Sequence, residues 1–306
     1  LMNSFSTSAD TKAFFDKYPE FAGSVFDSEV ELMQGKVPKI SQETFEPVAH
    51  ADAPDHEWCP PGHGELYVAL ASSGKLDKLL EDGFKYMFVS NSDNLGATLS
   101  LELLTYFAEK NVDFLMEVCE RTESDKKGGH LARSVADNKL MLRESAQCPK
   151  EDEKEFQNIA KHRFFNTNNL WINLVALKKA LSEHDGVLPL PVMRNAKTVD
   201  PTNSASTKVY QLESAMGSAI SFFPNAAAMV VPRTRFAPVK TCNDLMNLRS
   251  DVYSETADHR LVMIPERNGV PPVVALEDKN YKFVDQFEAA VAGAVPSLKG
   301  CSKLAI

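Results

Sequence analysis

The stretch that most constrains the fold is KYMFVSNSDNLGAT, which runs from Lys85 to Thr98. Its segment from Tyr86 to Ser90 is a short, largely apolar run, too short for a core helix and rich in strand formers, which predicts a buried parallel strand. Small polar residues follow at once and favour a turn, and a leucine-rich helical pattern begins after Gly96. Because open α/β sheets bind ligands at the carboxyl ends of their strands, Asp93 is a candidate ligand for Mg²⁺. The alternative is an Asx turn that simply ends the strand.

Length and composition set the broad class of the protein. The 306 residues suffice for one large domain, or for one domain with an appendage. The net charge of −9 gives no support for a nucleic-acid partner, although local lysines and glycine-rich loops can still hold an anionic small ligand. The five cysteines are scattered without metal-binding spacing, so we expect reduced thiols and a cytoplasmic location. No apolar run approaches the length of a membrane span, and no membrane partner is expected.

The two ends of the chain are unusual. It begins with LMNSF, which is typical of the tail of a strand, and it stops at LAI without an obvious closing element. We therefore expect this sequence to be a fragment of a longer protein.

A second informative stretch is WCPPGHGELY, from Trp58 to Tyr67. Two prolines stiffen the approach to Gly62 and His63, and a helix is expected to follow from Glu65. A glycine loop that opens a helix presents free backbone N–H groups, which suit phosphate or a base carbonyl. A purely structural turn has the same composition and remains the alternative.

A third informative stretch is FFNTNNLW, from Phe164 to Trp171. Its three amides and one threonine are costly to bury among apolar residues without hydrogen-bond partners. A polyhydroxylated ligand such as a sugar would satisfy them, and so in part would capping of the helix expected from Leu174 to Leu181.

The remaining pattern predicts strands alternating with helices. The expected elements include strands over Phe26–Gln34, Val112–Glu120 and Ala226–Val231, a hairpin over Leu131–Arg143, and helices over Val209–Ser218 and Val284–Ala292. The strand from Ala226 leads into PRTRFAPVKT, a loop with three cations and two prolines.

These motifs occur in one order with KKGGHL, NAKTVD and YQLESAMG between them. Together they closely resemble the UTP–glucose-1-phosphate uridylyltransferase family, also called UDP-glucose pyrophosphorylases. The resemblance is specific from Leu1 to about Tyr253 and fainter beyond. It implies an α/β protein with a Rossmann-like nucleotide-diphospho-sugar transferase fold, in which a mixed sheet is sandwiched by helices. Residues 1–253 would be the catalytic domain, and residues 254–306 its end and the lead into a β-helix domain.

The resemblance also implies an activity and a set of site residues. UTP and α-glucose 1-phosphate would give UDP-glucose and pyrophosphate, reversibly and with Mg²⁺ on Asp93. The implied contacts to UTP or its uridine come from Gln34, Gly62, Asn91, Ser92, Asp93 and Lys240. The implied contacts to the sugar phosphate come from His63, Gly129, Glu144, Asn166, Asn168 and Lys197. Lys240 would bind phosphate at the reacting centre, and His63 is better interpreted as a hydrogen-bond donor than as an acid–base catalyst.

Two features of the family are expected outside this sequence. Its glycine-rich nucleotide loop should precede residue 1, and its C-terminal β-helix, through which the parent protein would form oligomers, should follow the end. Two alternatives therefore stay open: a UDP-N-acetylhexosamine pyrophosphorylase with the same chemistry, and a truncated fragment that binds UDP-sugar without catalysis.

Overall fold

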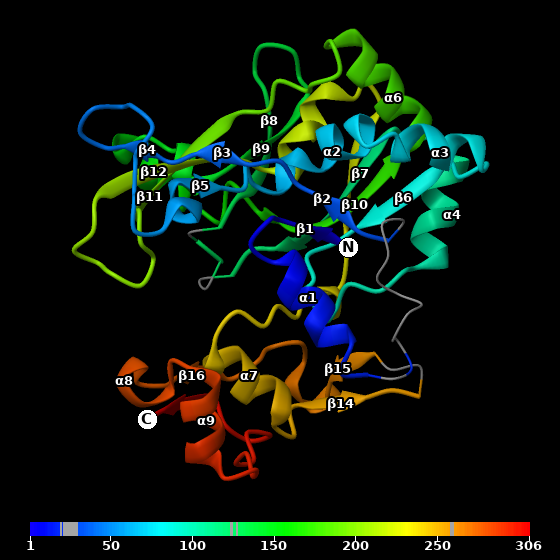
Figure 1. The fold of residues 1–306 in the computed structure, drawn as a ribbon. Helices are drawn as coiled ribbons and strands as arrows, with labels where there is room; N and C mark the ends of the chain where they lie inside the picture. The colour runs from blue at the N-terminus through cyan, green and yellow to red at the C-terminus, as the bar shows by residue number, and fades with distance from the viewer. Residues whose placement is uncertain (19, 21–29, 123–124, 127, 258–259) are drawn as a thin grey trace.

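A computed structural model describes residues 1–18, 20, 30–122, 125–126, 128–257 and 260–306. At its centre is a six-stranded mixed sheet (Figure 1). The strands are β6 (Tyr86–Val89), β7 (Phe114–Glu120), β8 (His130–Arg133), β9 (Leu140–Arg143), β10 (Phe164–Asn173) and β13 (Ala226–Val230). Their order is β13-β7-β10-β8-β9, and β6 pairs with the far half of β10. β13 runs parallel to β7, whereas β10 is antiparallel to β6, β7 and β8.

Helices cover both faces of this sheet, which confirms the predicted mixed sheet sandwiched by helices. The helices are α2 (Leu66–Ser72), α3 (Lys75–Glu81), α4 (Leu101–Glu109) and α6 (Leu174–Glu183). Because successive side chains of a strand point to opposite faces, Phe114 and Met116 of β7 join the core with α2, α3 and α6, while Leu115 packs with Phe107 of α4. Burial on both faces explains why five of the seven residues of β7 are apolar.

The expected strand at Tyr86–Ser90 is present as β6, but its predicted parallel pairing is wrong. β6 lies antiparallel to β10, and its residues are only half-buried. A short apolar run specifies a strand without specifying its neighbour, and here β10 supplies the partner for Val89 at Leu170.

A second, smaller sheet extends from the central one. It consists of β4 (Ile40–Ser41), β11 (Val192–Thr198) and β12 (Lys208–Ser214) in the order β11-β12-β4, and the pair β3 (Val37–Pro38) and β5 (Trp58–Cys59) lies near it. The helix predicted over Val209–Ser218 is wrong, because residues 208–214 form β12. The apolar spacing suited a helix, but β12 pairs with β11 along all seven residues and with β4 on its other side. This pairing outweighs the local preference.

The first residues form a small two-stranded element. β1 (Met2–Asn3) pairs in parallel with β2 (Leu32–Met33), and α1 (Ser8–Phe15) follows β1. The strand predicted over Phe26–Gln34 is confirmed only in part by β2, since residues 26–29 lie outside the described residues.

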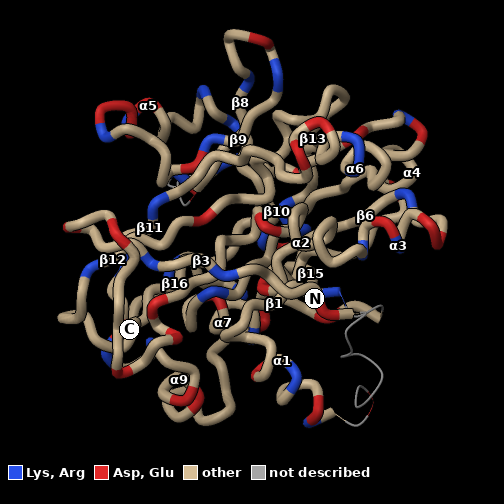
Figure 2. The backbone as a smooth tube through the Cα atoms, turned by 45° about the horizontal axis from the view of Figure 1, so that its top comes forward, with Lys and Arg blue, Asp and Glu red and all other residues tan. Residues whose placement is uncertain are grey.

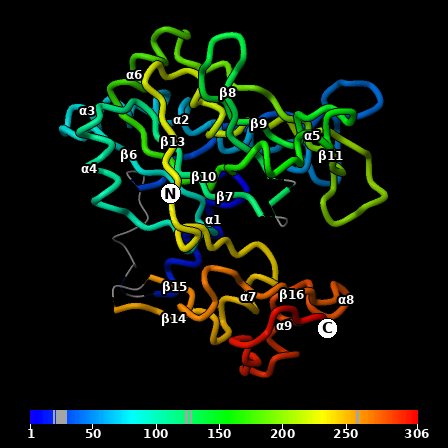
Figure 3. The backbone as a smooth tube through the Cα atoms, turned by 180° about the vertical axis from the view of Figure 1, so that it is seen from behind, coloured from blue at the N-terminus to red at the C-terminus, as the bar shows by residue number. Residues whose placement is uncertain are grey.

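The C-terminal segment packs around its own small core. Its elements are α7 (Cys242–Arg249), β14 (Tyr253–Glu255), β15 (Leu261–Met263), β16 (Val273–Ala275), α8 (Asp278–Tyr281), α9 (Val284–Val291) and β17 (Lys303–Ala305). Phe287 and Met246 are buried at its centre. Seen from behind, this lobe lies below the central sheet (Figure 3). The division after Tyr253 stays a prediction, and α7 already packs in the C-terminal core.

Charged residues of both signs are mixed along the tube (Figure 2). The charged segment after residue 150 contains the short helix α5 (Glu153–Phe156). Among the described residues, no helix has the length and apolar character needed to cross a membrane.

A buried histidine lies in β8, between strands β10 and β9 of the central sheet. His130 of β8 is 0% exposed, and its ring stacks on that of His162 at a centroid distance of 4.1 Å. Its Nδ1 lies 3.3 Å from Nη1 of Arg121, and its Nε2 lies 3.4 Å from Nη1 of Arg143. Burial, with smaller contributions from His162 and the two arginines, lowers the pKa of His130 to about 3. The imidazole is therefore neutral in the folded protein at neutral pH.

This burial predicts a specific dependence of stability on pH. In the unfolded chain the histidine pKa is about 6.5, so unfolding takes up a proton between that pH and the folded value. His130 should thus contribute full stability above pH 6.5 and lose it as the pH falls toward 3, by up to about 1.4 kcal/mol per pH unit. Urea unfolding of the wild type and of His130→Gln at pH 7.5, 6 and 5 measures this slope. The variant should show a shallower decline. A slope equal to that of the wild type would contradict the prediction, and His184→Gln, at the end of α6, serves as the control.

Candidate functional site

The turn that follows β6 lies between two cavities. The larger has a volume of about 1950 Å³, and the smaller about 240 Å³. Both are lined by Asn91 and Asp93, so the two spaces meet at the carboxyl end of β6. The larger cavity is also lined by Gln34, His63 and Ser92, and the smaller one by Gly129, Asn166, Asn168 and Lys240. Nine of the residues predicted for the site therefore line one or both of these adjoining cavities.

The remaining three predicted residues line neither cavity. Gly62 directly precedes His63, and Glu144 lies against Gly129. Lys197 is exposed on β11, and nothing in its described surroundings connects it to the junction. The role of each residue in binding stays a prediction.

The Gly62–His63 turn is held against the end of β12. Gly62 has a φ of +87°, and a Cβ at this position would lie 2.7 Å from the backbone oxygen of Ser214. Only glycine meets both conditions without strain. The backbone N–H of Ser214 donates to the oxygen of Pro61 at 2.9 Å and fastens the turn.

A hydrogen bond from the backbone of Met216 fixes the tautomer of His63. The backbone N–H of Met216 donates to its Nδ1 at 3.1 Å. Burial lowers the pKa of His63, and Lys240 lowers it slightly further, against an opposing effect of Glu213. A neutral ring that accepts at Nδ1 carries its proton on Nε2. His63 lines the larger cavity and can therefore donate a hydrogen bond from Nε2. Its role as a donor to the substrate stays a prediction.

Asp93 presents an unused oxygen at the junction. Its Oδ1 is buried and finds no hydrogen-bond partner within the part of the chain that the structure describes. Its Oδ2 lies 3.9 Å from Nζ of Lys240, whose side chain is 62% exposed. The carboxylate and the ammonium thus face the same space from two different loops. Burying a carboxylate oxygen without a partner costs free energy unless a cation or a hydrogen-bond donor binds it. Asp93 and its surroundings therefore fit a bound metal ion.

The two loops that carry Asp93 and Lys240 are joined by their backbones. Val239 N–H donates to the oxygen of Asp93 at 2.9 Å, and Leu95 N–H donates to that of Ala237 at 3.1 Å. A Cβ on Gly96 would lie 2.5 Å from the oxygen of Thr234, so the close approach requires glycine there.

Beneath these loops lies a buried ionic network that the sequence analysis missed. Glu117 of β7 is 0% exposed and receives two hydrogen bonds from Arg235, at 2.6 and 2.7 Å. Trp171 Nε1 and Asn169 Nδ2 donate to the same carboxylate at 2.9 and 3.0 Å. The carboxylate of Glu117 is fully removed from water and therefore needs hydrogen-bond donors from the protein. These four hydrogen bonds supply them.

Asn94 connects this network to the two loops. Its Nδ2 donates to Oδ1 of Asn169 and to the backbone oxygen of Arg235, both at 3.1 Å. Its Oδ1 accepts from the N–H groups of Gly96 at 3.1 Å and Ala237 at 2.8 Å. Asn94 thereby fixes the spacing between the loops that bear Asp93 and Lys240. The signal available in the sequence was Glu117, a glutamate with apolar residues on both sides in the run FLMEVCE.

The amides of β10 divide between this network and the smaller cavity. Asn169 joins the network, and Thr167 Oγ1 donates to the backbone oxygen of Glu117 at 2.8 Å. Asn166 and Asn168 line the cavity and bond to each other, with Asn168 in a left-handed conformation at φ +61° beside an irregularity in the β7–β10 register. Thr167 and Asn169 therefore find their hydrogen-bond partners within the protein, whereas Asn166 and Asn168 face the smaller cavity.

Gly129 lies against the carboxylate of Glu144. A Cβ at this glycine would lie 2.5 Å from Glu144 Oε2, so any larger residue would displace that side chain. Burial raises the pKa of Glu144. This pair lies at the end of the β8–β9 hairpin, next to the smaller cavity.

Comparison with known proteins identifies relatives over the whole chain. A sequence profile described as UTP–glucose-1-phosphate uridylyltransferase matches residues 1–306. The uridylyltransferase of that name from Encephalitozoon cuniculi is 42% identical over 96% of this chain and 56% of its own length. The one from Saccharomyces cerevisiae is 40% identical over 95% of this chain and 56% of its own length.

Solved structures agree. A UDP-glucose phosphorylase from Trypanosoma brucei superposes with a TM-score of 0.91 and 63% identity, over 100% of this chain and 65% of its own. A UDP-glucose pyrophosphorylase mutant from Leishmania major in complex with UDP-glucose gives 0.91 and 57%, over 99% and 65%. The chain thus spans about half to two thirds of the length of these relatives.

The buried network predicts a difference between two glutamates of β7. Glu117→Gln should remove the charge that Arg235 needs and lower the free energy of unfolding by about 3 kcal/mol, because an uncompensated buried charge remains. Glu120→Gln removes the partner of the exposed Arg163, and should cost at most about 1 kcal/mol. Chemical denaturation of both variants measures the difference. Equal losses in the two would show that the buried network does not stabilise the fold.

Proposed function

Because the chain belongs to the UTP–glucose-1-phosphate uridylyltransferase family, we propose that the protein forms UDP-glucose and pyrophosphate from UTP and α-glucose 1-phosphate. The observation that carries this proposal is the junction at Asn91 and Asp93, where a large and a small cavity meet. A transferase that joins two phosphorylated substrates needs two adjacent sites whose reacting phosphates come together. The turn after β6 provides such a place.

The larger cavity suits the nucleotide. The amide oxygen of Gln34 is buried there and lacks a hydrogen-bond partner among the described residues. A uracil ring offers an N–H donor to such an oxygen. Gly62, Asn91 and Ser92 would complete the contacts to uridine and its phosphates. His63, which lines the same cavity, would donate from Nε2 to the sugar phosphate.

The smaller cavity suits the sugar. Asn166 and Asn168 offer amide donors and acceptors, and the half-buried carboxylate of Glu144 lies behind Gly129. Hydroxyl groups pair well with such side chains, and a site built this way rejects ligands that leave its polar groups unpaired. Lys197 would assist with the sugar phosphate only if β11 or the substrate brings it closer.

The chemistry requires positioning more than acid–base catalysis. A phosphate oxygen of glucose 1-phosphate attacks the α-phosphorus of UTP, a new O–P bond forms, and pyrophosphate leaves with the electron pair of the broken bond. The attacking phosphate is already ionised, so no proton must be removed. Lys240 stands beside Asp93 and would neutralise charge on the transferring phosphate.

Asp93, with its orphaned Oδ1, would hold Mg²⁺. When bound, the ion would neutralise charge on the phosphate oxygens. Asn91 and Ser92 lie beside Asp93 along the same cavity and would orient the phosphates there.

The function is tested by pyrophosphate release from UTP with α-glucose 1-phosphate, measured on the intact protein. Lys240→Ala should lower kcat by about 100-fold or more, as loss of a transition-state donor does, with little change in Tm. Lys139→Ala, at the tip of the β8–β9 hairpin, should leave kcat unchanged. Near-normal turnover in Lys240→Ala would remove this lysine from the mechanism.

The same assay separates the alternatives. Faster turnover of N-acetylglucosamine 1-phosphate than of glucose 1-phosphate would identify an N-acetylhexosamine pyrophosphorylase instead. Binding of UDP-glucose without any pyrophosphate exchange would identify a non-catalytic binding protein.

The role of Asp93 is tested by its dependence on metal. Asp93→Asn keeps the shape of the turn but weakens a hard oxygen ligand, so the Mg²⁺ concentration for half-maximal rate should rise and the maximal rate should fall. The measurement is the initial rate over a Mg²⁺ titration. Asp77→Asn on α3 is the control, and it is preferred to Asp125→Asn because Asp125 also lines the smaller cavity. An unchanged Mg²⁺ dependence in Asp93→Asn would favour the simple Asx turn.

A further inference from the structure

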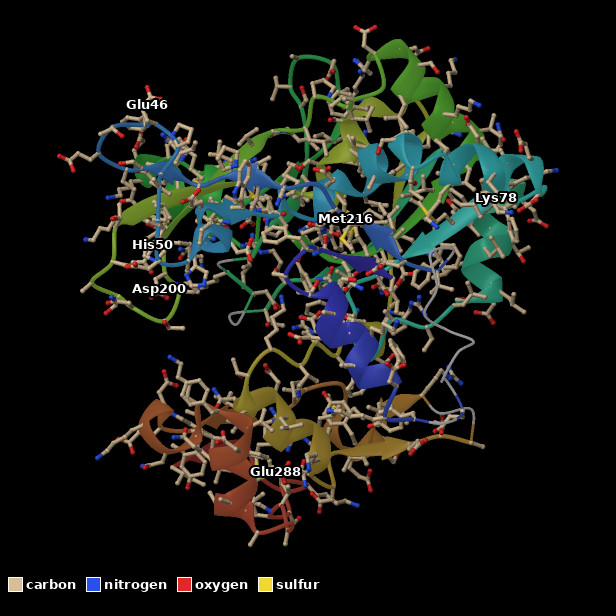
Figure 4. All side chains as sticks on the ribbon, in the orientation of Figure 1. Glu46, His50, Lys78, Asp200, Met216 and Glu288 are labelled. Carbon is tan, nitrogen blue, oxygen red and sulfur yellow. The ribbon has the colours of Figure 1, made fainter. Side chains whose placement is uncertain are left out.

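Three side chains that could bind a metal lie close together outside the two cavities of the proposed site. His50 and His56 belong to the loop between β4 and β5, and Asp200 belongs to the loop between β11 and β12. One potential ligand atom from each lies within 4.8 Å of the others. Figure 4 shows His50 and Asp200 one above the other at the left end of the small sheet. None of the three lines either cavity of the proposed site.

Hydrogen bonds among the described residues do not satisfy every ring nitrogen of this cluster. Nδ1 of His56 is buried and has no hydrogen-bond partner among the described residues, and it lies 4.0 Å from Oδ1 of Asp200. That separation is too long for a hydrogen bond. The rings of His50 and His56 stack at a centroid distance of 5.8 Å with an interplanar angle of 11°. A second group is needed to satisfy the nitrogen.

The backbone and the carboxylate are held in place. The N–H and Oγ1 of Thr202 donate to Oδ1 of Asp200 at 2.8 and 2.7 Å, which orients the carboxylate and leaves Oδ2 available. The N–H of His50 donates to Oε1 of Glu57 at 2.7 Å. Hydrogen bonds of this kind, one step removed from the metal, typically hold ligands in position.

We propose that His50, His56 and Asp200 bind one Zn²⁺ ion. Two imidazole nitrogens and one carboxylate oxygen are a common zinc ligand set, with a fourth position left for water. Zinc–ligand distances of about 2.0–2.2 Å place tetrahedral ligands roughly 3.4 Å apart. The ligand atoms lie within 4.8 Å of one another, so the side chains need to close by up to about 1.4 Å. Mg²⁺ prefers oxygen ligands and octahedral geometry, and does not suit this set.

Zinc here would tie together two loops from distant parts of the chain. The loop that carries His50 and His56 is attached to the small sheet through β4, and the loop that carries Asp200 joins β11 to β12. The buried Lys39 already links these regions, because its Nζ donates to the backbone oxygen of Val199 at 2.9 Å. The ion would add a second, stronger link beside this one and stabilise the small sheet.

The proposal is tested on the intact protein after removal of metal with a chelator. Titration with Zn²⁺ should show one equivalent bound and raise Tm by a few degrees, since a ligand that binds only the folded state stabilises it. Mg²⁺ at the same concentration should not displace the bound Zn²⁺, because Mg²⁺ prefers oxygen ligands. Co²⁺ substituted for Zn²⁺ should give the visible absorption of a tetrahedral site.

Matched variants locate the ion. His56→Asn and Asp200→Asn should each weaken Zn²⁺ binding by about tenfold or more. The amide oxygen introduced by Asp200→Asn can still accept the hydrogen bonds of Thr202, so the loop should stay folded. Asp52→Asn, a carboxylate in the same loop outside the cluster, should bind like the wild type. Absence of the tetrahedral Co²⁺ spectrum, or Zn²⁺ binding that survives both substitutions, would overturn the proposal and leave a simple histidine–aspartate ion pair.

Discussion

The arrangement of the catalytic candidates depends on one buried charge pair. Glu117 lies in the middle of the central strand β7 without exposure to water, and Arg235 reaches it from a loop 118 residues further along. An ionised carboxylate in such a place is stable only with complete hydrogen bonding, so Arg235, Trp171 and Asn169 must all be in position. The loop after β13 is therefore tied to the sheet at Arg235, a short distance along the chain before Lys240. Asn94 bonds to both Asn169 and Arg235, so it also ties the turn that bears Asp93 to this charge pair.

This network explains how a reacting centre can be open and still be rigid. Asn94 and Asn169 use their polar atoms on the protein, whereas Oδ1 of Asp93 and Oε1 of Gln34 have no hydrogen-bond partner among the described residues. Transfer between two phosphates draws most of its rate from holding the groups in place. A site for such chemistry needs polar atoms that are free to bind substrate and a backbone that is held rigidly. The loops after β6 and β13 provide both.

The sequence predicted what depends on local pattern and missed what depends on distant partners. The turn at Asp93, the β8–β9 hairpin and the strand before Arg233 are local, and the structure contains them. The antiparallel neighbour of β6 could not be read from a short apolar run. The helix expected at Val209 became a strand because β11 and β4 lie on either side of it. The sequence shows Glu117 and Arg235 as charged residues, but they lie 118 positions apart and no local pattern predicts that they pair.

Strand β12 relates the proposed zinc site to the proposed nucleotide site. It starts at Lys208, just after the Asp200 loop, and ends at Ser214, whose backbone holds the turn of Gly62 and His63. A strand of this length spans roughly 20 Å, so the two sites lie at opposite ends of one short, paired element. Such a strand does not lengthen or shorten, because its partners β11 and β4 fix its register. Metal binding at one end would therefore act on the stability of the small sheet, and would leave the geometry of His63 at the other end unchanged.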